Sequence, residues 1–136
     1  MYISLNKNDT ILDIGSNDAT MLKYYSDEYD RIGMDPTGRQ FEKHYRDIKN
    51  LTLIPDYFSY DSFVKSQNNK KCKIVSSISM FYDLPNPVKF AEDIYKILHD
   101  DGIWTCEQSY LLTMIKTNSL DTICHEHLEY YGLKQI

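Results

Sequence analysis

Short apolar runs alternate with longer amphipathic stretches along this chain of 136 residues. Runs that are bounded by Gly, Pro or Asp are typical of strands, and apolar residues at helical spacing are typical of helices. The pattern predicts strands over 10–14, 31–34, 51–54, 73–78 and 102–107. It predicts helices over 19–25, 39–46, 59–66 and 87–98. A mostly helical tail is expected over 108–136.

Strands that alternate with helices form right-handed βαβ units and a parallel sheet. We therefore expect a single α/β domain over 1–136, with a Rossmann-like, mostly parallel sheet in the order 3-2-1-4-5 and helices on both faces. Ligands of such sheets bind at the carboxyl ends of the strands, near the first strand. The loops that follow the strands are therefore the expected positions of binding and catalytic residues.

Composition removes several classes of function. The chain has 20 acidic and 15 basic residues and a net charge of −5, which argues against a nucleic-acid-binding surface. No apolar run approaches the ~18–20 residues that span a bilayer, so a cytoplasmic protein is expected. The three cysteines are widely spaced and form no CxxC pair, which favours reduced thiols over disulfides or a zinc ribbon.

The loop after the first predicted strand reads Asp13-Ile14-Gly15-Ser16-Asn17-Asp18. A glycine there lets the backbone pass close to a ligand, and the following segment offers free N–H groups. Neither GxGxxG nor the Walker pattern is present. Asp13 would repel a diphosphate but suits the cationic amino-acid portion of S-adenosylmethionine. A plain α/β turn with a capping side chain is the alternative.

Two further loops add weight to this interpretation. Asp35, which follows the second predicted strand and precedes Pro36, can accept hydrogen bonds from both ribose hydroxyls. The segment Asp56-Tyr57-Phe58, after the third strand, suits an adenine ring and its amino group. Ordinary turns explain both segments equally well in isolation. The loop over 77–87, after the fourth strand, should border the same pocket.

The most distinctive segment is Cys124-His125-Glu126-His127. A cysteine and two histidines could bind zinc, but no second cluster completes a site, so we expect no metal. A His beside a Glu is alternatively a plausible general base, because imidazole titrates near neutral pH. A pair of surface histidines is the third interpretation.

These motifs together resemble the class I S-adenosylmethionine-dependent C-methyltransferases of the nucleotide-deoxysugar type. The resemblance rests on ILDIGSND over 11–18, GMDP over 33–36 and CHEHLEYY over 124–131. It implies a methyltransferase fold in which this chain lacks the last two strands of the family's seven-stranded sheet. Family members are also longer and carry a zinc module and a substrate domain. An open sheet edge would then invite a second copy to form a homodimer.

The resemblance also implies roles for individual positions. The methionine part of the cofactor would lie against Asp13, Gly15, Ser16 and Asn17. Asp35 and Pro36 would hold the ribose. The adenine would be flanked by Asp56, Tyr57 and Phe58, and the pocket floor closed by Ser77, Ile78 and Ser79. His127 matches the family's proposed general base, Glu126 its acidic neighbour, and His125 is a candidate donor to the enolate oxygen.

The function that follows is methyl transfer to a carbon next to a ketone in a small, sugar-like substrate such as a nucleotide sugar. Two departures from the family stand out: Cys124 replaces a frequent Tyr, and Ala19 replaces a second glycine. The alternatives are an O- or N-methyltransferase with the same pocket, and a non-catalytic module that binds the cofactor. A dehydrogenase is the weakest alternative, because the glycine fingerprint is incomplete.

Overall fold

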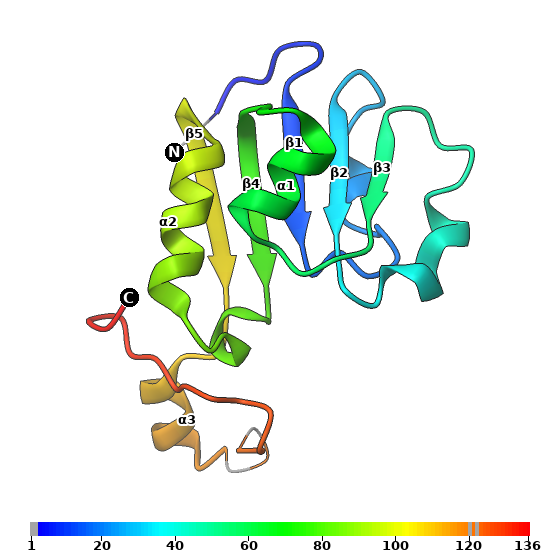
Figure 1. Cartoon of the computed structure of the whole chain (residues 1–136). Coiled ribbons are helices and arrows are strands. Elements are labelled where there is room, and N and C mark those ends of the chain that lie inside the picture. Colours follow the sequence, from blue (N-terminus) through cyan, green and yellow to red (C-terminus); the bar gives the residue numbers. More distant parts are fainter. Residues whose placement is uncertain (1–2, 120, 122) are drawn as a thin grey trace.

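A five-stranded parallel sheet forms the centre of the computed structural model, which describes residues 3–119, 121 and 123–136 (Figure 1). Its order, β3-β2-β1-β4-β5, is the predicted one, and each neighbouring pair is parallel. The strands are β1 (Thr10–Ile14), β2 (Asp30–Met34), β3 (Leu51–Ile54), β4 (Cys72–Ile78) and β5 (Leu98–Glu107). The predicted α/β fold class is confirmed.

Two hydrophobic clusters cover the two faces of the sheet. Because side chains alternate along a strand, Leu12 and Ile14 belong to one cluster and Ile11 to the other. The first cluster is covered by the two longer helices, α1 (Tyr60–Gln67) and α2 (Pro87–Ile97), which lie together in front of the sheet in Figure 1. The second packs against the 3₁₀ segments η1 (Leu22–Tyr24) and η2 (Gly38–His44).

The segment after β1 differs from the predicted helix over 19–25. Only Leu22–Tyr24 is helical, and as a single 3₁₀ turn. Asn17 and Ala19 have φ angles of 45° and 61°, so the backbone passes twice through the left-handed region before the turn begins. A continuous α-helix cannot start from such a backbone.

The fifth strand begins earlier than predicted. The expected turn at 100–102 lies inside β5, where the pairing register with β4 shifts: Cys72 pairs with Leu98, but Ile74 pairs with Ile103. The extra residues of β5 bulge out of the ladder while the strand continues. Gly102 belongs to this irregular part, where an added Cβ would lie 2.9 Å from the carbonyl oxygen of Cys72.

The expectation of a mostly helical tail over 108–136 is wrong for most of its length. Helix α3 covers Leu111–Thr117 and ends at Asn118 in the left-handed conformation. The described residues of 121–136 form turns and chain without regular secondary structure. Figure 1 shows this tail on the side of the sheet where the arrowheads of β4 and β5 end. The histidine motif is therefore presented by irregular chain at the carboxyl ends of the strands.

The sheet order leaves β3 and β5 as the edge strands of the part of the chain that is described. An open edge offers unpaired backbone groups to another chain, and the expected homodimer through such an edge stays a prediction. Among the described residues, no helix has both the length and the apolar character needed to cross a bilayer.

Candidate active site

The loop after β1 is held in place by the end of β2. Gly15 has a φ of 80°, a conformation that glycine adopts without strain, and its N–H donates to the carbonyl oxygen of Met34 at 2.8 Å. The N–H of Asn17 donates to Oδ2 of Asp35 at 2.9 Å. The first two predicted loops thus form one hydrogen-bonded unit.

Asp35 is the centre of this unit. It is only 4% exposed, and its other oxygen, Oδ1, accepts from the N–H of Thr37 at 2.7 Å and from its hydroxyl at 2.6 Å. A carboxylate can accept about four hydrogen bonds, so these three leave capacity for a ligand hydroxyl. Asp35 therefore both orders the loops and presents an acceptor at the end of β2.

A cavity of about 390 Å³ opens at the carboxyl ends of the strands. This volume lies within the range of small-molecule pockets. Of the residues predicted to bind a cofactor, eight line the cavity: Gly15, Asn17, Asp35, Pro36, Tyr57, Phe58, Ile78 and Ser79. Residues from four separate loops thus converge on one site, as the strand-end argument requires.

The other four predicted residues lie outside this lining. Asp13 and Ser16 are each 5% exposed and Ser77 is fully buried. Strand alternation turns Asp13 to the face of the sheet opposite Ile14, where its Oδ1 accepts a 2.7 Å hydrogen bond from the Ser76 hydroxyl. Asp56 is exposed, and its Oδ1 accepts from the N–H of Tyr57 at 2.8 Å.

Burial of Asp13 has an electrostatic consequence. The pKa of Asp13 is raised from 3.8 to about 6, chiefly because burial removes water from the carboxylate. The Ser76 hydrogen bond opposes this rise, and the nearby charge of Asp35 adds to it. The same pocket of side chains holds Tyr45, whose hydroxyl donates to Oγ of Ser16 at 2.7 Å. Burial raises the pKa of Tyr45 to about 12. Gly33 makes room for that ring, because a Cβ there would collide with the Tyr45 hydroxyl.

Sequence reasoning missed several lining residues. Ile14, Met34, Thr37 and Phe90 complete the wall. The first two are the last residues of β1 and β2, so the strand-end rule alone could have named them. Phe90 comes from α2 and contacts Phe58, with ring centroids 5.2 Å apart; no local signal identifies such a contact. The remaining lining residues, Met80, Asp83, Leu84 and Pro85, belong to the predicted bordering loop over 77–87.

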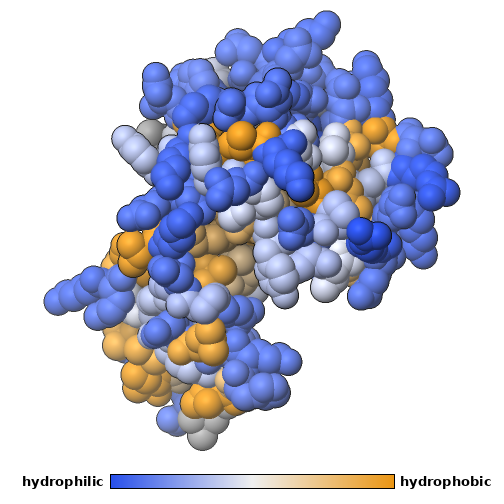
Figure 2. Space-filling model, viewed as in Figure 1, coloured by the Kyte–Doolittle hydropathy of each residue, from blue (hydrophilic) through white to orange (hydrophobic). Residues whose placement is uncertain are grey.

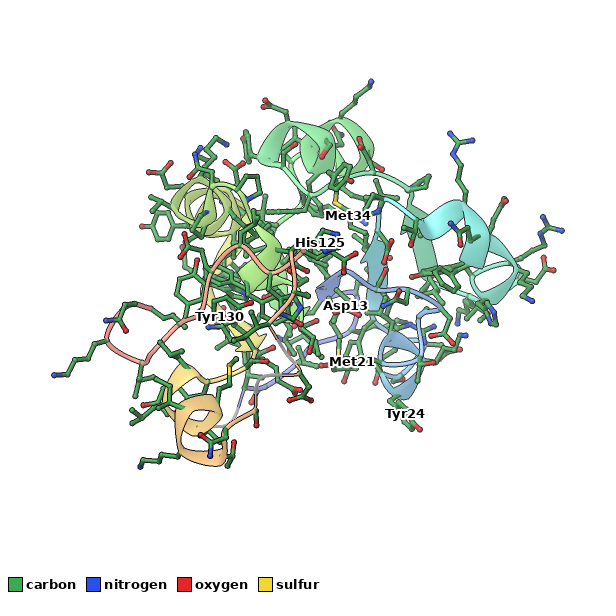
Figure 3. The ribbon with its side chains drawn as sticks, turned by 90° about the horizontal axis from the view of Figure 1, so that it is seen from below. Asp13, Met21, Tyr24, Met34, His125 and Tyr130 are labelled. Atoms are coloured by element: carbon green, nitrogen blue, oxygen red, sulfur yellow. The ribbon has the colours of Figure 1, made fainter. Side chains whose placement is uncertain are left out.

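The histidine segment is attached to the domain at the 3₁₀ turn η3 (Phe81–Asp83). The N–H groups of Leu128 and Glu129 both donate to the carbonyl oxygen of Tyr82, at 3.0 and 3.1 Å. The ring of Tyr131 packs on Phe81 at a centroid distance of 5.4 Å, and its carbonyl oxygen accepts from the N–H of Leu111 at 2.9 Å. Viewed from below, the chain that carries His125 and Tyr130 crosses in front of the strand ends (Figure 3).

The three candidate catalytic side chains occupy different environments. His127 is half-buried and lies against Tyr82, with ring centroids 4.3 Å apart. The backbone N–H of His127 donates to the carbonyl oxygen of Cys124 at 3.3 Å. His125 is 92% exposed, and its Nε2 lies 4.0 Å from Oε1 of Glu126, which is also mostly exposed. Glu126, the acidic neighbour expected for His127, thus lies at ion-pair distance from the other histidine, His125.

Within the described residues, no group of three or more His, Cys, Asp and Glu side chains lies close enough to hold a metal ion. Cys124 and Cys106 are free thiols on or near the surface, and Cys72 is a buried one.

Comparisons with known proteins identify the family of the chain. A family model described as "Methyltransferase domain" matches residues 2–136. The C-methyltransferase NovU of Streptomyces niveus is 26% identical over 133 residues, which are 96% of this chain and 31% of that protein. The chain thus spans about a third of the length of this curated relative.

Solved structures share the fold. A methyltransferase structure from a complex with the Trm112 activator of Haloferax volcanii is 18% identical, with a TM-score of 0.73 over 96% of this chain and 58% of that one. The plantazolicin methyltransferase BpumL, solved with SAH, is 19% identical, with a TM-score of 0.67 over 88% of this chain and 46% of that one. Sheet topology, strand-end cavity and the family match across nearly all residues lead to one assignment: the chain belongs to the methyltransferase domain family, whose methyl donor is S-adenosylmethionine.

Proposed function

We propose that this protein transfers a methyl group from S-adenosylmethionine to a carbon atom next to a ketone in a small, sugar-like molecule. The observation that supports the proposal is that the cavity and the histidine segment share one point of contact. The strand-end cavity and the segment that carries His127 meet at the same turn, η3, which lines the cavity with Asp83 and contacts His127 with Tyr82.

The residues of the cavity fit this cofactor. Asp35 offers carboxylate oxygens for ribose hydroxyls at the end of β2, and Pro36 lies beside it. Phe58, Ile78 and Met34 supply an apolar wall for adenine. Gly15 and Asn17, which follow β1, bring backbone close to the methionine portion of the cofactor. Asp13 and Ser16 are buried beneath this loop and do not line the cavity. When bound, the cofactor supplies an electrophilic methyl group on a sulfonium.

His127 is the base in this proposal. Carbon is a weak nucleophile until a proton next to a carbonyl group is removed, and a neutral imidazole can accept that proton near neutral pH. The ring of Tyr82 contacts the imidazole on one side, with centroids 4.3 Å apart and the two planes tilted by 52°. The enolate oxygen then needs a hydrogen-bond donor. His125, with its exposed ring two residues away, is the proposed donor, and the Cys124 thiol would be a weaker one.

The identity of the relative supports methylation of carbon. NovU is named as a C-methyltransferase and aligns with 96% of this chain. The nucleotide-sugar substrate is the finer part of the proposal and rests on the resemblance of the CHEHLEYY segment.

Product analysis tests the reaction. The protein is incubated with S-[methyl-¹³C]adenosylmethionine and a keto-sugar nucleotide, and the product is examined by ¹³C NMR. We expect a methyl signal coupled to a ring carbon. A label on oxygen or nitrogen would assign the protein to the O- or N-methyltransferases instead. Tight cofactor binding without product from any keto-sugar would support the non-catalytic alternative.

A further inference from the structure

Charge is distributed unevenly between the two ends of the sheet. The segments that follow the strands carry seven of the 20 carboxylates of the chain and none of its 15 Lys and Arg side chains; they are 15–21, 35–37, 55–59, 79–86, 108–110 and 118–133. The segments that lead into the strands carry four carboxylates and five Lys or Arg side chains; they are 1–9, 25–29, 45–50 and 68–71. Because the strands are parallel, the negative charge gathers at the edge that holds the cavity.

The cavity lies among these carboxylates. Asp35 and Asp83 line it, and Asp18 and Asp56 each stand next to a lining residue in the sequence. The other three belong to the tail, which is attached to the domain at η3. We call the whole set the acidic rim; it consists of Asp18, Asp35, Asp56, Asp83, Asp121, Glu126 and Glu129.

The first cations that follow three of these segments have other contacts. The Lys23 ammonium, on η1, donates to the carbonyl oxygen of Asp18 at 2.8 Å. Lys89, in the first turn of α2, forms an ion pair with the buried carboxylate of Asp93. Arg39 lines a separate hollow beside β3. No Lys or Arg side chain lines the strand-end cavity in the part of the chain that the structure describes.

Carboxylates from different segments act together beneath the first loop. Burial raises the pKa of the Tyr45 hydroxyl to about 12, and its hydrogen bond to Ser16 partly offsets the rise. The charges of Asp13, Asp35 and Asp18 all add to it. Charges from β1, from the loop after it and from the end of β2 thus reach the same buried group. The negative field at this edge is therefore shared between segments.

The methyl donor and its product differ in charge. S-adenosylmethionine has a sulfonium, an ammonium and a carboxylate group and is a net monocation at neutral pH. When the methyl group is transferred, the sulfur keeps the electron pair of the broken S–C bond, and the thioether product has no net charge. A negative field that is focused in a cleft attracts a cation and leaves a neutral molecule almost unaffected. The bound donor is therefore stabilised more than the bound product.

We propose that the acidic rim makes the strand-end cavity selective for the charged methyl donor over its neutral product, with Asp83 acting from the cavity wall. Loss of the positive charge on methyl transfer then weakens the hold of the site on the product and favours its exchange for a new donor molecule. The inference rests on the proposed function for the place of the donor in this cavity, but not for the acceptor or the base.

The test is a calorimetric titration with S-adenosylmethionine, S-adenosylhomocysteine and sinefungin at about pH 7.5, where unperturbed histidines are mostly neutral. Sinefungin has an amine in place of the methylated sulfonium and keeps the positive charge. Titrations in about 20 mM and about 500 mM salt shorten the screening length from roughly 20 Å to roughly 4 Å. We expect high salt to weaken both charged ligands at least about 3-fold, the effect of one charge about 7 Å away in water, and to leave the neutral product unchanged.

Variants locate the effect. Asp83→Asn removes one charge and keeps the shape of an exposed side chain, so it should weaken the two charged ligands about 3-fold at low salt and leave the product unchanged. Asp83→Glu, which keeps the charge, should retain most of the preference. Asp47→Asn, an exposed carboxylate at the opposite edge of the sheet, is the matched control and should change none of the three affinities.

The outcomes separate this inference from the proposed function. A ratio of product to donor dissociation constants that salt leaves unchanged would overturn the selectivity, and a salt-dependent ratio that is the same in Asp83→Asn would overturn the role of Asp83. Asp35→Ala removes ribose contacts that donor and product share, so it should weaken both. If it weakens neither, the donor does not lie in this cavity and the proposed function fails with the inference. If it weakens both while the ratio ignores salt, the inference alone fails.

Discussion

The sheet and the tail of this protein are built by different means. In the sheet, β1 is buried along its whole length and β4 along all but its last residue, as is usual for parallel strands covered on both faces. In the tail, the large apolar side chains Leu112, Ile115, Leu128, Leu133 and Ile136 are all 46–79% exposed. Figure 2 shows hydrophobic residues gathered on the tail surface, whereas most of the outer surface around the sheet is hydrophilic.

The two regions contribute different parts of the candidate site: the sheet provides the cavity, and the tail provides the histidine motif. The cavity is formed mainly by strand ends and by loops that hydrogen-bond to one another, so it is fixed by the core. The histidine motif is attached through a few contacts, chiefly two N–H donors on the Tyr82 carbonyl and the Tyr131–Phe81 ring contact. Substitutions in the sheet should therefore affect folding and cofactor affinity, and substitutions in the tail should affect turnover.

The largest expected effect is on turnover. His127→Asn should reduce kcat roughly 10²–10⁴-fold, the usual contribution of a general base, and leave the affinity for S-adenosylmethionine nearly intact, because the cavity does not include this side chain. His125→Asn should cost less. Steady-state kinetics and a binding titration of the same samples make the measurement. A parallel loss of cofactor affinity would show that the tail helps to build the cavity.

The second effect is on stability. Leu12 is fully buried in β1 and Leu133 is 79% exposed in the tail. Leu12→Ala should lower the free energy of unfolding by about 2–5 kcal/mol, the sum of lost burial and an unfilled cavity. The matched change Leu133→Ala should stay within about 0.5 kcal/mol. Urea denaturation provides both values, and similar losses for the two variants would refute the contrast between the regions.

The pattern of the sequence predicted the sheet better than the tail, for a physical reason. Strand positions and order follow from local hydrophobic runs and the right-handed crossover rule, and the helix over 87–98 was found almost to the residue because Pro87 and the apolar spacing mark it. In the tail, Leu128 and Glu129 are held by backbone hydrogen bonds to Tyr82 of η3, more than forty residues away in sequence. Helical spacing of Leu and Tyr carries no information about such bonds.

The site shows the same limit. Loops after strands identified eight cavity residues, because parallel strands end at one edge. The pattern could not show that Asp13 faces away from the cavity, or that Tyr82 contacts the histidine segment. Both facts depend on strand register and tertiary packing rather than on local sequence.

A third prediction concerns pH. The native pKa of Asp13 is about 6, above the ordinary value of 3.8, so the folded state favours the protonated acid. Its contribution to stability is full below about pH 4 and is lost as the pH rises through 6, a change of about 3 kcal/mol. Asp13→Asn should remove this dependence and stabilise the ligand-free protein at pH 7–8.

Urea denaturation across pH 4–8 measures the effect as the difference between variant and wild type. Ser76→Ala provides a companion test: loss of a hydrogen bond that lowers the pKa of Asp13 should move the transition to higher pH. A constant difference between Asp13→Asn and wild type over the whole pH range would contradict the assigned burial.

The smallest expected effect is on cofactor affinity. Asp35→Ala should weaken binding of S-adenosylmethionine by about 1–3 kcal/mol, the usual cost of losing hydrogen bonds to a charged group. Asp35 also orders its own loop, so Thr37→Val, which removes only the hydroxyl donor to Oδ1, measures the share that comes from loop order. Equal losses in the two variants would mean that Asp35 acts through the loop alone.

The most direct measurement is a calorimetric titration of the wild-type protein with S-adenosylmethionine and, separately, with NAD. The cavity offers an acidic ribose site at Asp35 but no glycine-rich cradle for a diphosphate. We predict one molecule of S-adenosylmethionine bound per chain, weakened in Asp35→Ala, and no comparable binding of NAD. Binding of NAD with equal or higher affinity, or binding of S-adenosylmethionine that Asp35→Ala leaves unchanged, would contradict the assignment of the strand-end cavity as the methyl-donor site.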